Sequence, residues 1–318
     1  MKIKSKGALT VLLTIGCSLS GYANILVNDN WTDGTRTDPN SAATPPYAEN
    51  NGVVGTDTDA DGNLESAWFK GGAGTLTAAS GSITGSGMGA SSASWYTYFT
   101  PSATPATLVN PGDSLHITWQ FTPTGVNVGS TAQGFNLAVG LTPTASRVTA
   151  DASIPSAAYK AYAMQMNMAT VLGNANPFQL REWSLAGSGA LLGTSGNYTT
   201  LAGGGVNGNT GYTSGTLYTF DMTFTLNASL GLDITASMSG GSLNNSGTES
   251  VSFTDTTPNT LSFDTFDVRP SSEAASATSI ATSLFEVQFT PAPEPTSLAL
   301  GGFGLLALMG YHRNNRRQ

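Results

Sequence analysis

The feature that most constrains the fold is a stretch of strict alternation from Gly215 to Ser239. From Tyr218 on, apolar side chains occupy every second position, and the pattern is interrupted once, from Asn227 to Ser229. A period of two places the apolar residues on one face of an extended chain and the polar residues on the other. The stretch therefore predicts a β-hairpin whose apolar face packs on a core.

The interruption also predicts a register for this hairpin. A three-residue turn at Asn227 to Ser229 places Leu226 opposite Leu230. On the polar face, this register predicts two cross-strand pairs, Asp221 with Thr235 and Thr223 with Asp233.

Further β-prone segments lie along the rest of the chain. They are Ile25 to Val27, Ser94 to Phe99, Asp113 to Thr122, Phe135 to Leu141, Tyr159 to Met168, Phe178 to Leu185, Leu261 to Val268 and Ser283 to Phe289. Tyr159 to Met168 also contains good helix formers, but its alternation favours a strand. Short strands joined by turns in a chain with 38 glycines are typical of an antiparallel β-sandwich. We expect one all-β domain over residues 24–290.

The order of elements in the second half narrows this expectation. A long Tyr-Thr-Phe hairpin is followed by a Ser/Gly loop, the segment Leu261 to Asp267 and a closing strand. This order resembles the concanavalin A-like jelly roll of lectins, laminin-G-type modules and polysaccharide-active enzymes. The resemblance implies a jelly-roll body and a function that involves carbohydrate.

The first 23 residues read as a secretory signal peptide. Three lysines precede an apolar segment from Gly7 to Leu19, and Gly21 to Ala23 supplies the small residues that signal peptidase reads. The alternative is a lipoprotein signal with Cys17 as the lipidated residue. Thr14 stands where that signal has an aliphatic side chain, so the secretory signal is favoured.

The end of the chain, residues 291–318, has three parts. They are the triplet Pro293, Glu294 and Pro295, an apolar run from Leu298 to Tyr311, and the basic residues Arg313, Arg316 and Arg317. This arrangement resembles the PEP-CTERM sorting signal of Gram-negative bacteria that produce exopolysaccharide, which a membrane transpeptidase called exosortase recognises. The resemblance implies export, cleavage near the triplet and delivery to the cell surface or the extracellular matrix.

The apolar run of this tail is short for a permanent membrane span, which needs about 17 to 25 residues. A signal that is later removed needs only transient anchoring in the inner membrane as a hydrophobic helix, with the arginines on the cytoplasmic side. The alternative, a strand or helix buried in the domain, would leave three arginines beside a core.

Charge and rare residues exclude several classes of function. Between residues 24 and 290 there are 19 acidic and six basic side chains, so nucleic acid and anionic membrane surfaces are not expected partners. The single cysteine, Cys17, lies in the signal, which leaves the body without a disulfide or a cysteine nucleophile. His116 is the only histidine of the body, so a multi-histidine zinc site is excluded.

One acidic segment is a candidate calcium loop. Asp57, Asp59, Asp61 and Asn63 alternate around a glycine, as in the first half of an EF-hand loop. An EF-hand loop has a bidentate acidic residue at its twelfth position, and this sequence has Trp68 there, which argues against strong calcium binding. The alternative is a solvated Asp/Gly turn, and calcium is the one cofactor that the sequence suggests.

Paired carboxylates for glycoside hydrolysis are not evident in the sequence. Asp264 and Asp267 are three residues apart, which places them on opposite faces of a regular strand, and Glu182 and Glu286 have no acidic neighbour at a strand-compatible spacing. We therefore expect a noncatalytic surface protein, with a polysaccharide-active hydrolase or lyase on the same fold as the alternative.

Exopolysaccharide is the expected ligand of such a protein. Candidate binding residues are Trp95 and Trp183, which can stack on sugar rings, and His116 and Gln120, which share the polar face of one strand. The alternative for the tryptophans is a place in the core, where aromatic residues of strands are usually found.

Overall fold

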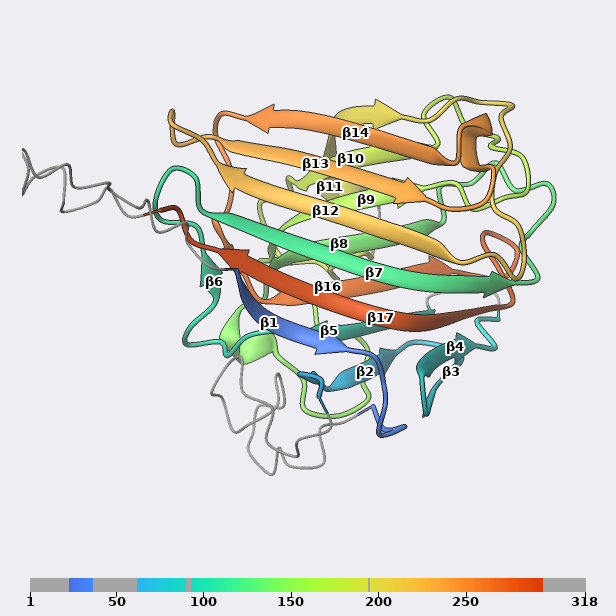
Figure 1. Cartoon of the computed structure of the whole chain (residues 1–318), viewed down its shortest axis with the longest axis horizontal. Coiled ribbons are helices and arrows are strands. Elements are labelled where there is room, and N and C mark those ends of the chain that lie inside the picture. The colour runs from blue at the N-terminus through green and yellow to red at the C-terminus, as the bar shows by residue number, and fades with distance from the viewer. Residues whose placement is uncertain (1–22, 37–61, 90–92, 194, 294–318) are drawn as a thin grey trace, which may run out of the picture. The chain divides into compact units, whose positions relative to one another are not determined.

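The computed structural model describes residues 23–36, 62–89, 93–193 and 195–293. Residues 23–291 form two large antiparallel sheets, here called sheet A and sheet B (Figure 1). Sheet A contains, in spatial order, β14 (Thr248–Asp255), β13 (Leu232–Ser239), β12 (Tyr218–Leu226), β7 (Ser114–Thr124), β17 (Ser279–Thr290), β4 (Ser82–Ser86) and β3 (Thr75–Ala79), with β1 (Asn24–Asp29) also paired to β17. Sheet B contains, in spatial order, β11 (Tyr198–Gly204), β10 (Phe178–Trp183), β9 (Lys160–Met166), β8 (Phe135–Leu141), β16 (Thr265–Ser271), β5 (Ala93–Tyr98) and β2 (Trp68–Gly71).

Short elements complete the described part of the chain. A two-stranded sheet pairs β6 (Ala106–Thr107) with β15 (Ser262–Phe263). Three single turns of 3-10 helix are η1 (Thr144–Ser146), η2 (Ser195–Asn197) and η3 (Leu243–Asn245). The predicted fold class, an all-β antiparallel sandwich of the jelly-roll type, is confirmed.

Strand β17, near the C-terminal end of the described residues, lies in sheet A beside β1, which is near their N-terminal end. One of its edges pairs with β7 along its whole length. Its other edge is shared, because β4 pairs with residues 279–282 and β1 pairs with residues 285–289. The register with β7 shifts between Thr282 and Leu284, at the point where one partner strand gives way to the other.

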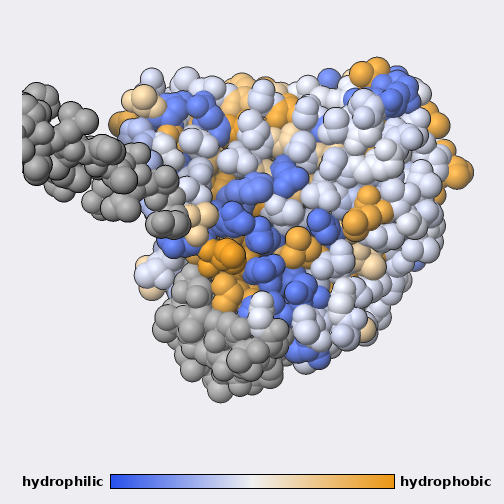
Figure 2. Space-filling view, in the orientation of Figure 1, coloured by the Kyte–Doolittle hydropathy of each residue, from blue (hydrophilic) through white to orange (hydrophobic). Residues whose placement is uncertain are grey.

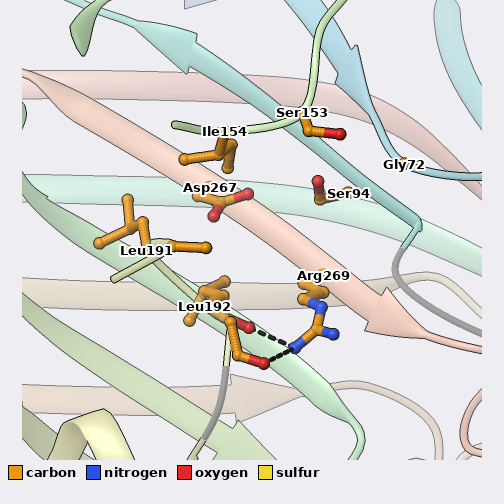
Figure 3. A pocket seen from close by; sticks show the side chains of 10 residues that line it. Gly72, Ser94, Ser153, Ile154, Leu191, Leu192, Asp267 and Arg269 are labelled. Atoms are coloured by element: carbon orange, nitrogen blue, oxygen red, sulfur yellow. Dashed lines mark hydrogen bonds between the residues drawn. The ribbon is translucent and has the colours of Figure 1, made fainter. Parts of the chain in front are cut away.

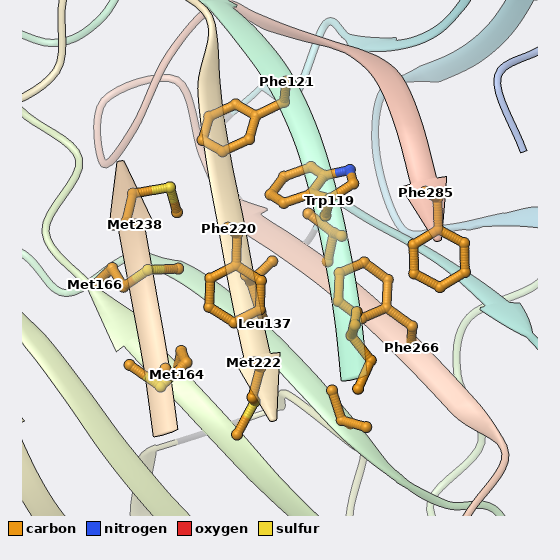
Figure 4. Packing of buried hydrophobic residues seen from close by; sticks show 14 of the residues in the cluster. Trp119, Phe121, Leu137, Met164, Met166, Phe220, Met222, Met238, Phe266 and Phe285 are labelled. Atoms are coloured by element: carbon orange, nitrogen blue, oxygen red, sulfur yellow. The ribbon is translucent and has the colours of Figure 1, made fainter. Parts of the chain in front are cut away.

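The core lies between the two sheets and is rich in aromatic side chains (Figure 4). Trp119 and Phe121 of β7 stack with their ring centroids 4.3 Å apart. The Trp119 indole N–H donates a 3.0 Å hydrogen bond to the Thr282 hydroxyl, so its polar atom is satisfied inside the core. Six buried methionines belong to this core: Met88, Met164, Met166, Met168, Met222 and Met238. Their flexible side chains suit the irregular gaps that large rings leave.

The predicted hairpin is present as β12 and β13, but its register differs from the predicted one. Leu226 pairs with Leu232 rather than with Leu230. On the polar face Asp221 lies opposite Ser237, and Thr223 lies opposite Thr235. A shift of two residues keeps the side chains of β12 and β13 on their predicted faces, and Leu230 of the turn is the exception.

The reason for the shift is a turn of five residues in place of three. The Asn227 side-chain oxygen accepts hydrogen bonds from the amides of Ser229 and Gly231, at 2.9 and 3.0 Å. Leu230 adopts a positive φ of 63°, and its side chain is 62% exposed. Leu230 therefore belongs to the turn rather than to the core-facing row, although its apolar side chain suggested otherwise.

The outer faces of the two sheets differ. In β12 buried residues alternate with half-buried ones, so the outer face of sheet A is in contact with solvent. All six residues of β5 are buried, because loops cover the outer face of sheet B. One such loop is fixed by the Tyr96 hydroxyl, which donates a 2.7 Å hydrogen bond to the carbonyl of Ala152.

Candidate functional site

Polar side chains of β7 and β12 meet on the outer face of sheet A. His116 Nε2 lies 3.1 Å from Asp221 Oδ1, and the Thr118 hydroxyl donates to the same oxygen at 2.8 Å. Gln120 lies on the same face of β7 as His116, two positions further on from Thr118. The hydrogen bonds from His116 and Thr118 lower the pKa of Asp221 against the opposing effect of partial burial. Asp221 is therefore ionised at neutral pH.

Next to Asp221 the face is hollowed into a groove of about 350 Å³ that crosses β12, β13 and β14. Its lining consists of Ala236 and Val251, whose side chains belong to the core, and of one carboxylate and five hydroxyl side chains: Asp221, Thr223, Thr235, Ser237, Ser250 and Ser252. We call it the hydroxyl groove. Figure 2 shows this side of the molecule, with hydrophilic side chains gathered over the middle of the face.

Sequence reasoning found one end of this site and missed the rest. His116 and Gln120 were predicted from the alternation of β7, and Asp221 was placed on the same face of the hairpin. The serines of β13 and β14 were not singled out, because serine in a strand is compatible with any solvated face. The available signal was Ser or Thr at every second position of neighbouring strands, namely Thr235 and Ser237 of β13 and Ser250 and Ser252 of β14.

The two predicted sugar-stacking tryptophans lie elsewhere. Trp95 is 2% exposed and belongs to the core between the sheets, and Trp183 is 6% exposed and packs against Tyr159 and Tyr198 on the covered face of sheet B. Neither ring offers a face to a ligand, so the prediction of Trp95 and Trp183 as binding platforms is wrong and both are packing residues. The exposed large apolar side chains of the described residues are all aliphatic: Ile25, Val109, Val128, Val171, Val206, Leu217 and Leu230.

The fold gives Glu182 an acidic neighbour that the sequence did not reveal. Its carboxyl group is in hydrogen-bond contact with Asp255, a residue of the other sheet. The Tyr162 hydroxyl lies 2.7 Å from Asp255 Oδ2 and 3.5 Å from Glu182 Oε1. Burial and the adjacent Asp255 raise the pKa of Glu182. The pair joins the two sheets at the edge where β10 and β14 lie together.

The candidate calcium loop lies mostly outside the described residues, which include neither Asp57, Asp59 nor Asp61. Asn63 is described and buried, and its side-chain amide donates a 3.0 Å hydrogen bond to Asn30 Oδ1. In the described ranges no three His, Cys, Asp or Glu side chains are grouped as metal ligands. Calcium binding by this loop stays a prediction.

The sorting signal is likewise not described beyond Pro293. Glu294, Pro295 and the arginines Arg313, Arg316 and Arg317 lie outside the described residues, as does the signal peptide. Within the described part of the chain, no helix is long and apolar enough to cross a membrane.

Comparison with known proteins adds three solved structures of similar architecture. No family model and no curated protein matches the chain. The carbohydrate recognition domain of Emp46p, in its metal-free form, superposes with a TM-score of 0.43 at 10% identity and covers 69% of this chain and 87% of its own. Peanut lectin gives a TM-score of 0.40 at 9% identity, with 74% and 94% covered. A protein of unknown function from Shewanella oneidensis MR-1 gives 0.40 at 13% identity, with 92% and 99% covered.

Proposed function

We propose that this protein is an exported, noncatalytic component of the cell surface or extracellular matrix that binds polysaccharide through the hydroxyl groove. The observation that carries the proposal is the groove itself. It combines five hydroxyl side chains with the carboxylate of Asp221, on the face of the sandwich that solvent reaches.

The chemistry of the groove matches that of a sugar chain. Serine and threonine hydroxyls both donate and accept hydrogen bonds, as sugar hydroxyls do, and an ionised carboxylate accepts them strongly. The groove crosses three strands, and neighbouring strands are about 4.8 Å apart, so its width is roughly 10 Å. A groove of this extent fits a run of linked rings better than a single ring.

The charge of the body narrows the class of polysaccharide. Between residues 24 and 290 acidic side chains outnumber basic ones by 19 to six, and Asp221 lies in the groove itself. A polyanionic chain would be repelled by this field. The ligand that fits is therefore a neutral or cationic polysaccharide.

The noncatalytic form of the proposal rests on the geometry of the carboxyl groups. A glycoside hydrolase holds its two carboxyl groups about 5 to 9.5 Å apart, on either side of the bond to be cleaved. Glu182 and Asp255 instead share contacts with the Tyr162 hydroxyl, and Asp255 is only 5% exposed, so the two carboxyl groups do not flank an open groove. They serve as a link between β10 and β14.

Export and sorting complete the proposal and rest on the sequence of the two ends. Signal peptidase would remove residues 1–23, and an exosortase-type transpeptidase would cleave near Pro293 to Pro295 after transient anchoring in the inner membrane. The body would then be delivered to the place where exopolysaccharide is found.

A glycan array, run with and without calcium, tests this function when combined with product detection on the same glycans. We expect binding to neutral or cationic polysaccharide without product release. Cleavage that is abolished by Glu182→Gln would overturn the noncatalytic assignment. Binding that appears only with calcium would assign the ligand to the Asp57 to Asn63 loop instead of the groove.

A further inference from the structure

A second cavity lies on the other side of the sandwich, against the outer face of sheet B (Figure 3). Its volume is about 190 Å³. Its floor is formed by Ser94 of β5 and by Asp267 and Arg269 of β16, and its walls are two loops that carry Ile154 and Leu191. It shares no residue with the hydroxyl groove, so an inference from it stands independently of the function proposed above.

Asp267 is the unusual residue of this cavity. It is 0% exposed, and neither of its carboxylate oxygens has a hydrogen-bond partner among the described residues. The alternation of β16 explains its position, because Phe266 and Val268 point into the core and Asp267 must point outward beneath the loops. An unsatisfied buried carboxyl group is costly, so a folded protein that retains one usually has a use for it.

Arg269 lies two positions further along the same face, but it is engaged elsewhere. Its Nη1 donates to the backbone carbonyls of Leu192 and Gly193, the latter at 2.9 Å. The guanidinium therefore faces the 190s loop instead of forming an ion pair with Asp267 (Figure 3). The floor of the cavity thus contains a buried carboxyl group without a hydrogen-bond partner and, on the same strand, a guanidinium that is bonded to the loop.

Both walls are held in place before any ligand arrives. Asp151 receives two 2.7 Å hydrogen bonds from Arg36 and one of 2.9 Å from the Lys70 amide, which fixes the loop next to Ile154. The other loop is tied by paired backbone hydrogen bonds between Ala157 and Gly189, at 3.0 and 3.1 Å. A cavity formed in advance loses little conformational entropy when it binds a ligand.

The lining indicates the chemical class of ligand. A ligand with net charge would lose its hydration in this cavity without gaining an ion pair, because the carboxyl group of Asp267 is fully buried and Arg269 already donates to two backbone carbonyls. Adjacent hydroxyl groups satisfy both, because one donates to the carboxyl group and the other accepts from the guanidinium or from Ser94. Leu191 and Ile154 then contact the C–H groups of the same ligand.

The size of the cavity limits the ligand to one ring. About 190 Å³ corresponds to roughly six water molecules at about 30 Å³ each, and it is below the 300 Å³ or more that larger ligands occupy. We propose that the Asp267 cavity binds a single neutral, hydroxyl-rich ring, either a free monosaccharide or the terminal residue of a glycan.

Isothermal titration of the purified full-length chain tests this proposal. The ligands are glucose, galactose and mannose, with glucuronate and glucosamine as charged relatives. We expect at least one neutral sugar to bind, and the charged relatives of that sugar to bind at least tenfold more weakly. Methyl glycosides and disaccharides with the same terminal ring show whether the ligand is a free monosaccharide or the terminal residue of a glycan. If they bind as well as the free sugar, the ligand is a chain end, and if they do not bind, it is a free monosaccharide.

Two variants assign the binding to the cavity. Asp267→Asn keeps the shape of the side chain and removes the carboxyl group, and Ser153→Trp places a large ring at the rim without changing a strand. Both should weaken binding at least tenfold, whereas Thr77→Leu, at an exposed residue of β3 outside both cavities, should leave it within twofold. The proposal is overturned if none of the neutral sugars binds, if a charged relative binds more tightly, or if binding is unchanged in both cavity variants.

Discussion

Arg147 Nη2 lies 2.8 Å from Asp264 Oδ2, and the two side chains are only 3% and 0% exposed. Oδ1 of the same carboxylate accepts hydrogen bonds from the Thr142 amide and the Thr265 hydroxyl. The guanidinium also lies 4.5 Å from the centre of the Tyr98 ring. This buried pair connects the start of β16 to the loop after β8.

Removing the cation from this pair should be strongly destabilising. Arg147→Met leaves Asp264 buried without its counter-charge, so we expect the free energy of unfolding to fall by about 3 to 5 kcal/mol. The matched control is Arg36→Met, because the Arg36–Asp151 pair has the same chemistry but side chains that are 29% and 35% exposed. That variant should lose about 1 kcal/mol or less. Urea unfolding at pH 7 measures both, and equal losses would contradict the assigned roles.

Two buried aspartates predict an unusual dependence of stability on pH. Burial raises the pKa of Asp29 and of Asp267 to about 8. In the unfolded chain an aspartate has a pKa of about 3.9, so between these values the folded state holds protons that the unfolded state has lost. Their contribution to stability is complete below about pH 4 and is lost as the pH rises to about 8.

We therefore expect the protein to be more stable at pH 5 than at pH 8. The slope should be at most about 1.4 kcal/mol per pH unit for each group. Asp267→Asn removes one of the two groups and should flatten the profile of unfolding free energy against pH. A stability that rises from pH 5 to pH 8 in the unmodified chain would contradict the assignment.

Gly85 of β4 is predicted to be required for core packing. A methyl group added there would lie 2.4 Å from the indole ring of Trp95, which is itself buried in the core. Gly85→Ala should lower the free energy of unfolding by about 1 to 3 kcal/mol, because the ring has no room to move aside. Gly129 has no atom within 4 Å of the same position, so Gly129→Ala is the control. Equal thermal unfolding temperatures for the two variants would contradict this account.

The tail makes a prediction about sorting. Replacing Pro293, Glu294 and Pro295 with alanines should block cleavage and release, because the Pro-Glu-Pro triplet is the part that the transpeptidase would read. The larger, unprocessed chain should accumulate in the membrane fraction, which immunoblotting of cell fractions detects. A double-alanine substitution at Thr296 and Ser297, which directly follow the triplet in the sequence, controls for nonspecific effects. Unchanged release of the triplet variant would refute the sorting proposal.

Local pattern was sufficient to predict the fold class and the faces of the hairpin, and it failed where side chains decided the local geometry. Alternation gives the face of each residue of β12 and β13 regardless of turn length. The register depended on Asn227, whose side chain caps a five-residue turn and places Leu230 in the left-handed region. The hydrophobic pattern does not show that Asn227 favours a five-residue turn over a three-residue one.

The candidate site was only partly predictable, because long-range packing determines exposure. Trp95 is buried because it packs against sheet A in the core, and Trp183 is buried because loops far away in the sequence cover the outer face of sheet B. Glu182 and Asp255 are neighbours only because β10 and β14 lie at the same edge of the sandwich. Asp267 was considered as half of a catalytic pair, whereas the structure places it alone beneath two loops.

The central claim, polysaccharide binding in the hydroxyl groove, is tested most directly by one comparison of dissociation constants. The same substitution, Thr to Leu, is made in the groove at Thr235 and at Thr77, an exposed residue of β3 at the far end of sheet A. For a neutral polysaccharide that the full-length chain binds, we predict at least tenfold weaker binding for Thr235→Leu and a change within twofold for Thr77→Leu. Equal affinities of the two variants would contradict the account, and so would a loss of polysaccharide binding in Ser153→Trp alone.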